Sequence, residues 1–164
     1  RGGALRMLPV LDEPTRECHV LRADRVLKSS DVTKLVQTAI AQHGAGYIRS
    51  DNGSEFITHE LQAWWAREKI KTIYIEPASP WQNGFVESFH GCSRDECLNG
   101  EQLWTLTEAR RVIEDFRIDY NTRRPHSMLG NRSSVNYAAQ LTAVLTPVDL
   151  PPSGQREPQP RYNP

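Results

Sequence analysis

Two acidic residues, Asp51 and Glu87, stand where an α/β protein can bring carboxylates together. Asp51 follows a short stretch of strand character, residues 46–50, and the Asn-Gly pair after it allows a sharp turn. Glu87 falls in the first turn of a helix predicted to begin near Asn83. Carboxylates at strand ends and helix starts can converge above a sheet and bind hard divalent cations. A pair of such cations activates a nucleophile and stabilises the leaving oxygen in phosphoryl transfer.

Each carboxylate taken singly also has an ordinary structural explanation. Asp51 fits an Asp-Asn-Gly turn, and a glutamate in the first turn of a helix is favoured by the helix dipole. The spacing adds a further observation, because Glu87 lies 36 positions after Asp51 and Arg94 lies seven positions after Glu87. Seven residues make about two turns of an α-helix, so we expect Arg94 to share the face of Glu87.

The elements that must position these residues are predicted from the periodicity of apolar residues and from capping residues. The predicted strands cover residues 4–11, 17–23, 46–50 and 71–75. The predicted helices run from caps at Ser29, Ser30 and Asp31 to His43-Gly44, from a cap at Ser54 past Trp65, from near Asn83 towards Leu98, and from a cap at Thr107 to Asn121. This order predicts an α/β fold in which a mixed sheet is flanked by helices.

The composition indicates one domain with an appendage. The chain has 164 residues, with 20 Lys and Arg against 20 Asp and Glu, so any nucleic-acid binding must come from a local patch. No apolar run approaches the roughly 18 residues of a membrane span, and three cysteines suit a reduced, cytosolic protein. We expect the folded core in residues 1–145 and a disordered tail in 146–164, where six of 19 residues are proline.

The sequence around these residues resembles the integrase-type catalytic core of bacterial insertion-sequence transposases, the D-D-35-E class related to retroviral integrases. The resemblance covers roughly residues 4–140 and rests on long motifs in a fixed order. The matching segments are Arg49-Ser50-Asp51-Asn52-Gly53-Ser54-Glu55-Phe56, Ser79-Pro80-Trp81-Gln82-Asn83-Gly84-Phe85-Val86-Glu87-Ser88-Phe89, Arg94-Asp95-Glu96-Cys97-Leu98-Asn99, Tyr120-Asn121 and Arg124-Pro125-His126-Ser127.

The resemblance implies a ribonuclease-H-like fold that acts on DNA, both at the ends of the element and at the target. In this family three carboxylates hold two Mg²⁺ or Mn²⁺ ions, which drive hydrolysis at the element's ends and joining to target DNA. Asp51 is similar to the second acid and Glu87 to the third, and Arg94 is similar to a basic residue that touches DNA near the cleaved phosphate. The intact protein is expected to be a homo-oligomer in the bacterial cytoplasm, associated with the nucleoid.

The family's first aspartate, usually in a Trp-x-x-Asp-Phe context, has no counterpart here. The text from Arg1 onwards aligns with the turn and strand that follow this acid, so the resemblance implies a fragment or decayed copy whose sheet lacks its first, central strand. Asp12 matches a hairpin-turn aspartate that is not a metal ligand in the family, and its turn would lie at the wrong end of the sheet. With Asp51 and Glu87 alone, we expect the chain to be inactive by itself.

A basic stretch at residues 117–132 carries four arginines against one aspartate, a local charge of +3. Arg123 and Arg124 are its candidates for contacts with DNA phosphates, and arginines favoured at a solvated helix end are an equal alternative. The sequence therefore favours the catalytic-core segment of a DDE transposase, which performs metal-dependent DNA cleavage and strand transfer. The alternatives are a non-catalytic DNA-binding or assembly remnant, and a metal-dependent nuclease of the same fold.

Overall fold

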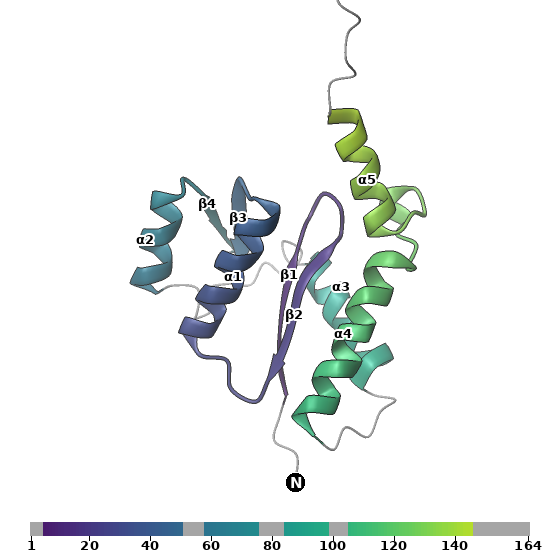
Figure 1. Ribbon diagram of the computed structural model, residues 1–164, viewed down its shortest axis with the longest axis horizontal. Coiled ribbons are helices and arrows are strands. Elements are labelled where there is room, and N and C mark those ends of the chain that lie inside the picture. Colours follow the sequence, from purple (N-terminus) through teal and green to yellow (C-terminus); the bar gives the residue numbers. More distant parts are fainter. Residues whose placement is uncertain (1–4, 51–57, 76–83, 99–104, 146–164) are drawn as a thin grey trace, which may run out of the picture.

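The computed structural model describes residues 5–50, 58–75, 84–98 and 105–145, and Figure 1 shows their arrangement. The strands are β1 (Arg6–Leu11), β2 (Cys18–Asp24), β3 (Tyr47–Ser50) and β4 (Lys71–Tyr74). The α-helices are α1 (Ser29–His43), α2 (His59–Arg67), α3 (Gly84–Ser93), α4 (Leu106–Thr122) and α5 (Ser134–Leu145). A π-helical turn, η2 (Arg94–Leu98), continues α3, and a 3-10 turn, η3 (Ser127–Leu129), precedes α5.

β1 and β2 form the predicted antiparallel hairpin, with a bulge near its tip. The register shifts between Val10 and Leu11, so His19 is the extra residue on β2. Because side chains alternate along a strand, this extra residue places Cys18 in the same core as Leu21. The bulge therefore lets both ends of β2 contribute to one apolar surface.

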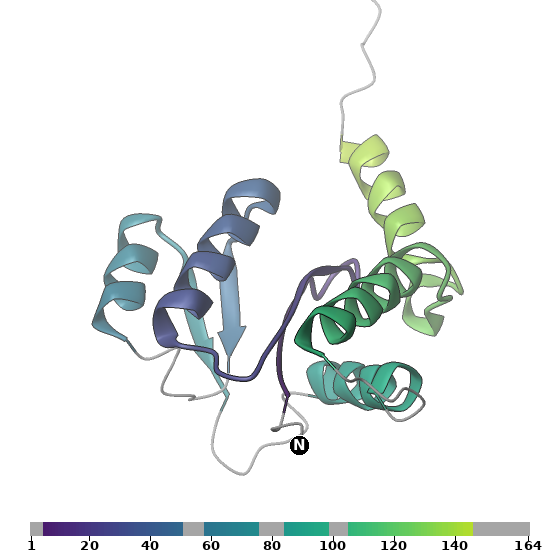
Figure 2. The same cartoon turned by 60° about the horizontal axis from the view of Figure 1, so that its bottom comes forward.

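The hairpin is covered by helices on both faces, which Figure 2 shows from the edge. On one face, Leu8 of β1 packs against Val32 and Val36 of α1. The opposite face carries Cys18, Leu21 and Ala23 against α3 and α4. Burial of apolar surface on both faces anchors the hairpin, and roughly 25 cal/mol per Å² of buried apolar surface is the stabilisation to expect.

β3 and β4 pair in parallel, from Tyr47 opposite Lys71 to Ser50 opposite Tyr74, with α2 as the crossover. They form a sheet of their own, so the described strands make two sheets of two strands where one mixed sheet was predicted. Figures 1 and 2 both show β3, rather than β4, on the side of the hairpin. Among the described residues no strand pairs with the second edge of β1 or of β3.

α3 and α4 enclose an aromatic core centred on Phe89, which is 1% exposed. The centroid of its ring lies 4.9 Å from that of Tyr120 and 5.9 Å from that of Phe116, both in edge-to-face geometry. Ile113 and Cys97 complete this buried cluster. Edge-to-face rings of this kind contribute about 0.5–1.5 kcal/mol per pair beyond their buried area, so Phe89 ties α3 to α4 and both to the hairpin.

The side chain of Asn121 on α4 is hydrogen-bonded to β2 as a neighbouring strand would be. The backbone N–H of Cys18 donates to Asn121 Oδ1 at 2.8 Å, and Asn121 Nδ2 donates to the Cys18 carbonyl at 2.9 Å. Arg117 Nη1 also donates to this carbonyl at 3.1 Å. Asn121 is 4% exposed, so its amide satisfies two backbone groups at the bulge that water does not reach.

The starts of the helices differ from the prediction because the capping residues lie earlier or later in the chain. The backbone N–H of Lys28, the N-cap of α1, donates to the Asp31 carboxylate at 3.3 Å. α4 begins after Thr105 and not at Thr107, because Thr105 and Glu108 form a capping box. α2 begins after Thr58, whose hydroxyl accepts from the N–H of Leu61. The predicted cap Ser54 lies outside the described residues.

α5 was not predicted as a helix. Ser134, its first residue, is buried beside α4, whereas Val144 near its other end is 81% exposed. Figure 1 shows α5 extending away from the rest of the chain. Within the described residues no helix is long and apolar enough to span a membrane. Residues 146–164, the predicted tail, lie outside the described residues.

Candidate active site

Asp51 itself lies outside the described residues, and the structure describes the strand that leads to it. β3 ends at Ser50, which is 7% exposed, and the N–H of Ile75 donates to the Ser50 carbonyl at 3.0 Å. Parallel pairing with β4 thus continues to the last residue before Asp51. The strand therefore fixes the position of Ser50, the residue that precedes Asp51 in the sequence.

Glu87 lies in the first turn of α3, as predicted, and its side chain faces solvent. The positive end of the helix dipole favours a carboxylate at this position. Phe89, two residues further on, is fixed in the aromatic core, and Ser93 is fully buried. Since two residues correspond to about 200° of rotation, the buried Phe89 directs Glu87 away from the core.

Arg94 lies at the junction of α3 and η2, with its side chain exposed. The backbone is α-helical from Glu87 to Ser93, so seven steps of about 100° bring Arg94 to within about 20° of the Glu87 direction. The π-helical turn begins at Arg94 and was not predicted. The wider π-helical turn changes the direction of the residues after Arg94. That Glu87 and Arg94 share one face of the helix stays a prediction from helix geometry.

The carboxylate of Asp12 is used by the hairpin turn. Its Oδ2 accepts from the backbone N–H of Thr15 at 3.0 Å and also from the Thr15 hydroxyl. The neighbouring Glu13 accepts a hydrogen bond from the hydroxyl of Tyr47, the first residue of β3, at 3.1 Å. The hairpin tip therefore lies beside the start of β3, whereas Asp51 follows its end.

Glu87 is the one residue of the predicted metal site that the structure describes. Within residues 5–50, 58–75, 84–98 and 105–145, no three side chains among histidine, cysteine, aspartate and glutamate come together as metal ligands. A metal site at Glu87 therefore needs carboxylates from outside these ranges, of which Asp51 is the predicted one.

Arg123 and Arg124, the other predicted DNA contacts, differ in their surroundings. Arg123 is exposed at the end of α4 and pairs with Asp119 at 3.2 Å. Arg124 is half-buried, pairs with Glu96 at 2.6 Å and donates to Cys92 Sγ at 3.3 Å. Cys92 is about 140° around α3 from Glu87, so the structure does not bring Arg124 to the Glu87 face.

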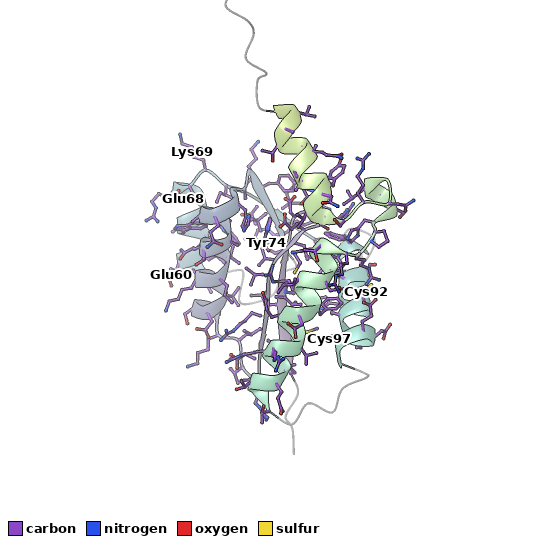
Figure 3. All side chains as sticks on the ribbon, turned by 45° about the vertical axis from the view of Figure 1, so that its right-hand side comes forward. Glu60, Glu68, Lys69, Tyr74, Cys92 and Cys97 are labelled. Carbon is purple, nitrogen blue, oxygen red and sulfur yellow. The ribbon has the colours of Figure 1, made fainter. Side chains whose placement is uncertain are left out.

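A cavity of about 420 Å³ lies on this other side of α3, and no single sequence motif predicted it. Figure 3 shows Cys92, one of its lining residues, on the α3 side of the molecule beside α4. The signal in the sequence was the arginine, proline and histidine run at 124–126, of which Arg124 alone had an assigned role, as a candidate contact with DNA phosphates. The lining residues are Arg16, Phe85, Ser88, Phe89, Cys92, Tyr120, Arg124, Pro125, His126, Ser127 and Met128.

The buried polar groups of this cavity are kept uncharged near neutral pH. Burial raises the pKa of Tyr120 to about 12. Burial lowers the pKa of His126, and the charges of Arg124 and Arg16 lower it further, against the opposing effect of a hydrogen bond with the backbone of Tyr120. His126 Nε2 lies 3.2 Å from the Ser134 hydroxyl, a contact that joins η3 to α5.

Comparison with known families identifies most of the chain. A family model described as "Integrase core domain" matches residues 1–80, and a second model with the same description matches residues 68–133. Together they cover residues 1–133, which include β1 to η3 and both predicted acids. The two matches overlap at residues 68–80, the segment around β4. Asp51 falls in the first match and Glu87 in the second.

Among curated proteins, the chain is similar to proteins of bacterial insertion elements. It is 39% identical to an uncharacterised 39.2 kDa protein of insertion element IS476 from Xanthomonas euvesicatoria, over 82% of this chain and 39% of that protein. It is 34% identical to an uncharacterised 31.7 kDa protein of IS407 from Burkholderia multivorans, over 87% of this chain and 52% of that protein. The chain thus spans about half or less of these relatives.

Among solved structures, the fold is similar to that of retroviral integrase cores. The HTLV-2 integrase catalytic core domain, in complex with magnesium and in a trimeric form, superposes with a TM-score of 0.60 at 15% identity. The match covers 82% of this chain and 92% of that one. The fold is therefore the ribonuclease-H-like fold, and the chain belongs to the integrase-core family of insertion-sequence transposases.

Proposed function

We propose that this chain is the catalytic-core segment of a DDE transposase, in which Asp51 and Glu87 are two of the metal-binding acids. The observation that carries the proposal is their placement. β3 ends one residue before Asp51, and α3 begins three residues before Glu87, with 35 residues between the two acids. Strand ends and helix starts are the positions from which side chains meet above an α/β sheet.

The donor set suits Mg²⁺ or Mn²⁺. Carboxylate oxygens are the ligands that these cations prefer, and Glu87 offers an exposed carboxylate at a helix start. When bound, a pair of such ions supplies activation of the attacking oxygen and stabilisation of the leaving one. Asp51 and Glu87 would hold the ions, and Arg94 would bind a phosphate of the DNA backbone beside them.

The DNA itself would lie along the exposed face that Glu87 and Arg94 are predicted to share. Arg123, at the solvated end of α4, would add a phosphate contact that positions DNA without reading its sequence. The HTLV-2 integrase core is described in a trimeric form, and this fold neighbour supports the proposal that the intact protein self-associates. DNA and a second copy of the chain are therefore its proposed partners.

The experiment compares the 164-residue chain with the same chain extended by a β-strand that carries an aspartate, designed to pair with β1 and β3. Nicking of supercoiled DNA in Mn²⁺ is the readout. We expect no activity from the chain alone, because two carboxylates cannot position two ions about 3.5–4 Å apart. The extended chain should nick DNA, and an extension carrying asparagine should not.

Matched variants assign the residues. In the extended chain, Glu87→Gln should abolish nicking. The matched control is Glu108→Gln, which changes another exposed acid in the first turn of a helix and should leave nicking unchanged. Turnover by the unextended chain that Asp12→Ala abolishes would identify Asp12 as the third ligand. Absence of nicking by every form, with DNA binding intact, would favour the non-catalytic DNA-binding or assembly remnant.

A further inference from the structure

The cavity beside Cys92 is built from three parts of the chain, by residues that the proposed catalytic site does not use. Phe85, Ser88 and Cys92 line it from α3, Arg124 to Met128 from the segment after α4, and Arg16 from the hairpin tip. The α3 residues lie about 100° to 200° around the helix from Glu87. The cavity therefore opens on a different face of α3 from the one that carries Glu87.

The charge of this cavity is positive. Its lining contains two arginines and no acidic residue. The guanidinium of Arg16 lies 4.2 Å from the centroid of the Phe85 ring, and within the described part of the chain no carboxylate pairs with it. Arg124 is paired with Glu96, but a guanidinium has five N–H donors, and that pair and Cys92 occupy two.

The backbone holds Arg16 in an unusual conformation. Its φ is +62°, a left-handed conformation that favours glycine or asparagine and strains an arginine. The turn fixes it there, because the N–H of Arg16 donates to the Asp12 carbonyl at 2.8 Å and the N–H of Asp12 donates to the Glu17 carbonyl at 2.8 Å. The hairpin tip thus keeps a charged side chain over the cavity at a position where glycine would be less strained.

The neutral part of the lining suits an oxyanion attached to a larger group. Ser88, Ser127 and Tyr120 offer hydroxyl donors, whereas Met128, which is 76% exposed, gives an apolar rim. The volume of about 420 Å³ falls in the range of small-molecule sites and is much larger than a phosphate group alone. The space beside the arginines can therefore take the sugar that a backbone phosphate carries.

We propose that this cavity binds a phosphate group of a DNA strand, with Arg16 and Arg124 as its two cationic donors. The proposal rests on the proposed function for the source of the phosphate, since an inorganic phosphate would satisfy the same donors. Arginine suits this role because its planar fork binds phosphate oxygens in pairs. The site would hold a stretch of DNA backbone on the face of α3 away from Glu87.

Cys92 provides a direct probe in the unmodified protein. Cys18 and Cys97 are 0% and 1% exposed, so Cys92 is the cysteine that a thiol reagent should reach first. The probes are a short single-stranded oligonucleotide, inorganic phosphate and an acidic peptide, and the readout is the rate of Cys92 alkylation. A ligand in the cavity at ten times its Kd should slow this rate about elevenfold, in proportion to the fraction of free sites.

Three variants of the chain test the assignment. Arg16→Gln should lower the affinity for the oligonucleotide about tenfold, the size of a weak charge-assisted hydrogen bond. At the same oligonucleotide concentration, the protection of Cys92 should then fall from about elevenfold to about twofold. Arg16→Lys should keep part of the protection, because it keeps the charge and loses the fork. Arg25→Gln, which removes an exposed arginine at the far end of β2, should leave it unchanged. Circular dichroism confirms that each variant is folded.

The outcomes separate this site from the proposed function. An oligonucleotide that binds the chain without protecting Cys92, and equally well to Arg16→Gln, would overturn the cavity site and leave the proposed function standing. No oligonucleotide binding, with protection by phosphate that Arg16→Gln removes, would overturn DNA as the source and contradict the proposed function. Protection by the acidic peptide at lower concentration than by either phosphate ligand would overturn phosphate as the ligand.

Discussion

The two regions that contribute the candidate acids are stabilised in different ways. In the hairpin–α4 region (residues 5–24, 84–98 and 105–132), an aromatic core and the amide of Asn121 connect elements about 100 residues apart in sequence. The β3–β4 region (residues 47–50 and 58–75) has a smaller core in which Leu61, Trp65 and Ile70 are buried. The first region adds side-chain hydrogen bonds between distant elements to its packing, whereas the second combines its smaller core with the parallel backbone pairing of β3 and β4.

The seam between the regions contains no backbone pairing among the described residues. α1 bridges them through apolar contacts, since Ile48 of β3 packs with both the α1–hairpin cluster and the α2 cluster. Figure 3 shows the other side of α2, with Glu60 and Glu68, turned away from this seam. Asp51 directly follows β3 in the sequence, and Glu87 belongs to the hairpin–α4 region. The geometry of the candidate acid pair therefore depends on a junction without backbone pairing between the described strands.

The largest expected effect separates the two cores. Phe89→Ala should lower the free energy of unfolding by about 3–5 kcal/mol and unfold the whole chain, because it removes the centre of the hairpin–α4 core. Trp65→Ala should lower the stability of the β3–β4 region by a similar amount while the hairpin remains protected. Hydrogen exchange followed strand by strand distinguishes these results. Simultaneous loss of protection in β2 and β4 of the Trp65 variant would contradict the two-region description.

The next effect tests the polar connection in the hairpin–α4 region. Asn121→Leu should lower the free energy of unfolding by about 2–4 kcal/mol, because both the N–H and the carbonyl of Cys18 lose a buried partner. Denaturant unfolding measures the loss. Thr122→Leu is the matched control on the next residue of α4, where the side chain is exposed. A loss below about 0.5 kcal/mol for Asn121→Leu would show that the amide is dispensable.

A smaller effect concerns pH and the seam. The rings of His19, on the β2 bulge, and His43, at the end of α1, stack at 3.6 Å between centroids. Burial lowers the pKa of His19 below its usual 6.5, and His43 lowers it further, against the opposing effects of Glu17 and Asp12. The unfolded chain therefore binds the proton more readily, so stability is present above about pH 6.5 and is lost as pH falls below it.

The histidine pair can be tested by unfolding at a series of pH values. His19→Phe should reduce the loss of stability at acidic pH, and His59→Gln, at an exposed histidine of α2, should not. The remaining pH dependence is expected in part from His126, whose pKa burial also lowers. An unchanged acid profile in His19→Phe would show that the stacked rings do not sense pH.

Local sequence patterns predicted the hairpin, α1, the β3–α2–β4 unit, α3 and α4, because each follows its own periodicity and each ends near a capping residue or a glycine such as Gly44. The T-x-x-E box at Thr105 was present in the sequence and was overlooked. The bond between Asn121 and Cys18 joins residues 103 positions apart, so no local pattern could predict it. For the candidate site, the placement of Glu87 was predicted, whereas the cavity at Arg16 depends on three distant segments meeting.

The smallest effect is expected at Glu13, the polar contact across the seam. Its carboxylate accepts from the Tyr47 hydroxyl at 3.1 Å and lies 3.4 Å from Arg49, and it is about one third exposed. Glu13→Gln keeps an acceptor for Tyr47 and removes the charge, so the free energy of unfolding should fall by only about 0.2–1 kcal/mol. The carboxylate hydrogen bond raises the pKa of Tyr47, so this pKa should fall in the variant, as NMR of labelled tyrosine would record. Because the hairpin is held to β3 at this point without backbone pairing, hydrogen exchange in β3 should also become faster, while exchange in β2 stays the same. Equal exchange in β3 of both proteins, despite the lower pKa of Tyr47, would show that α1 alone holds the two regions together.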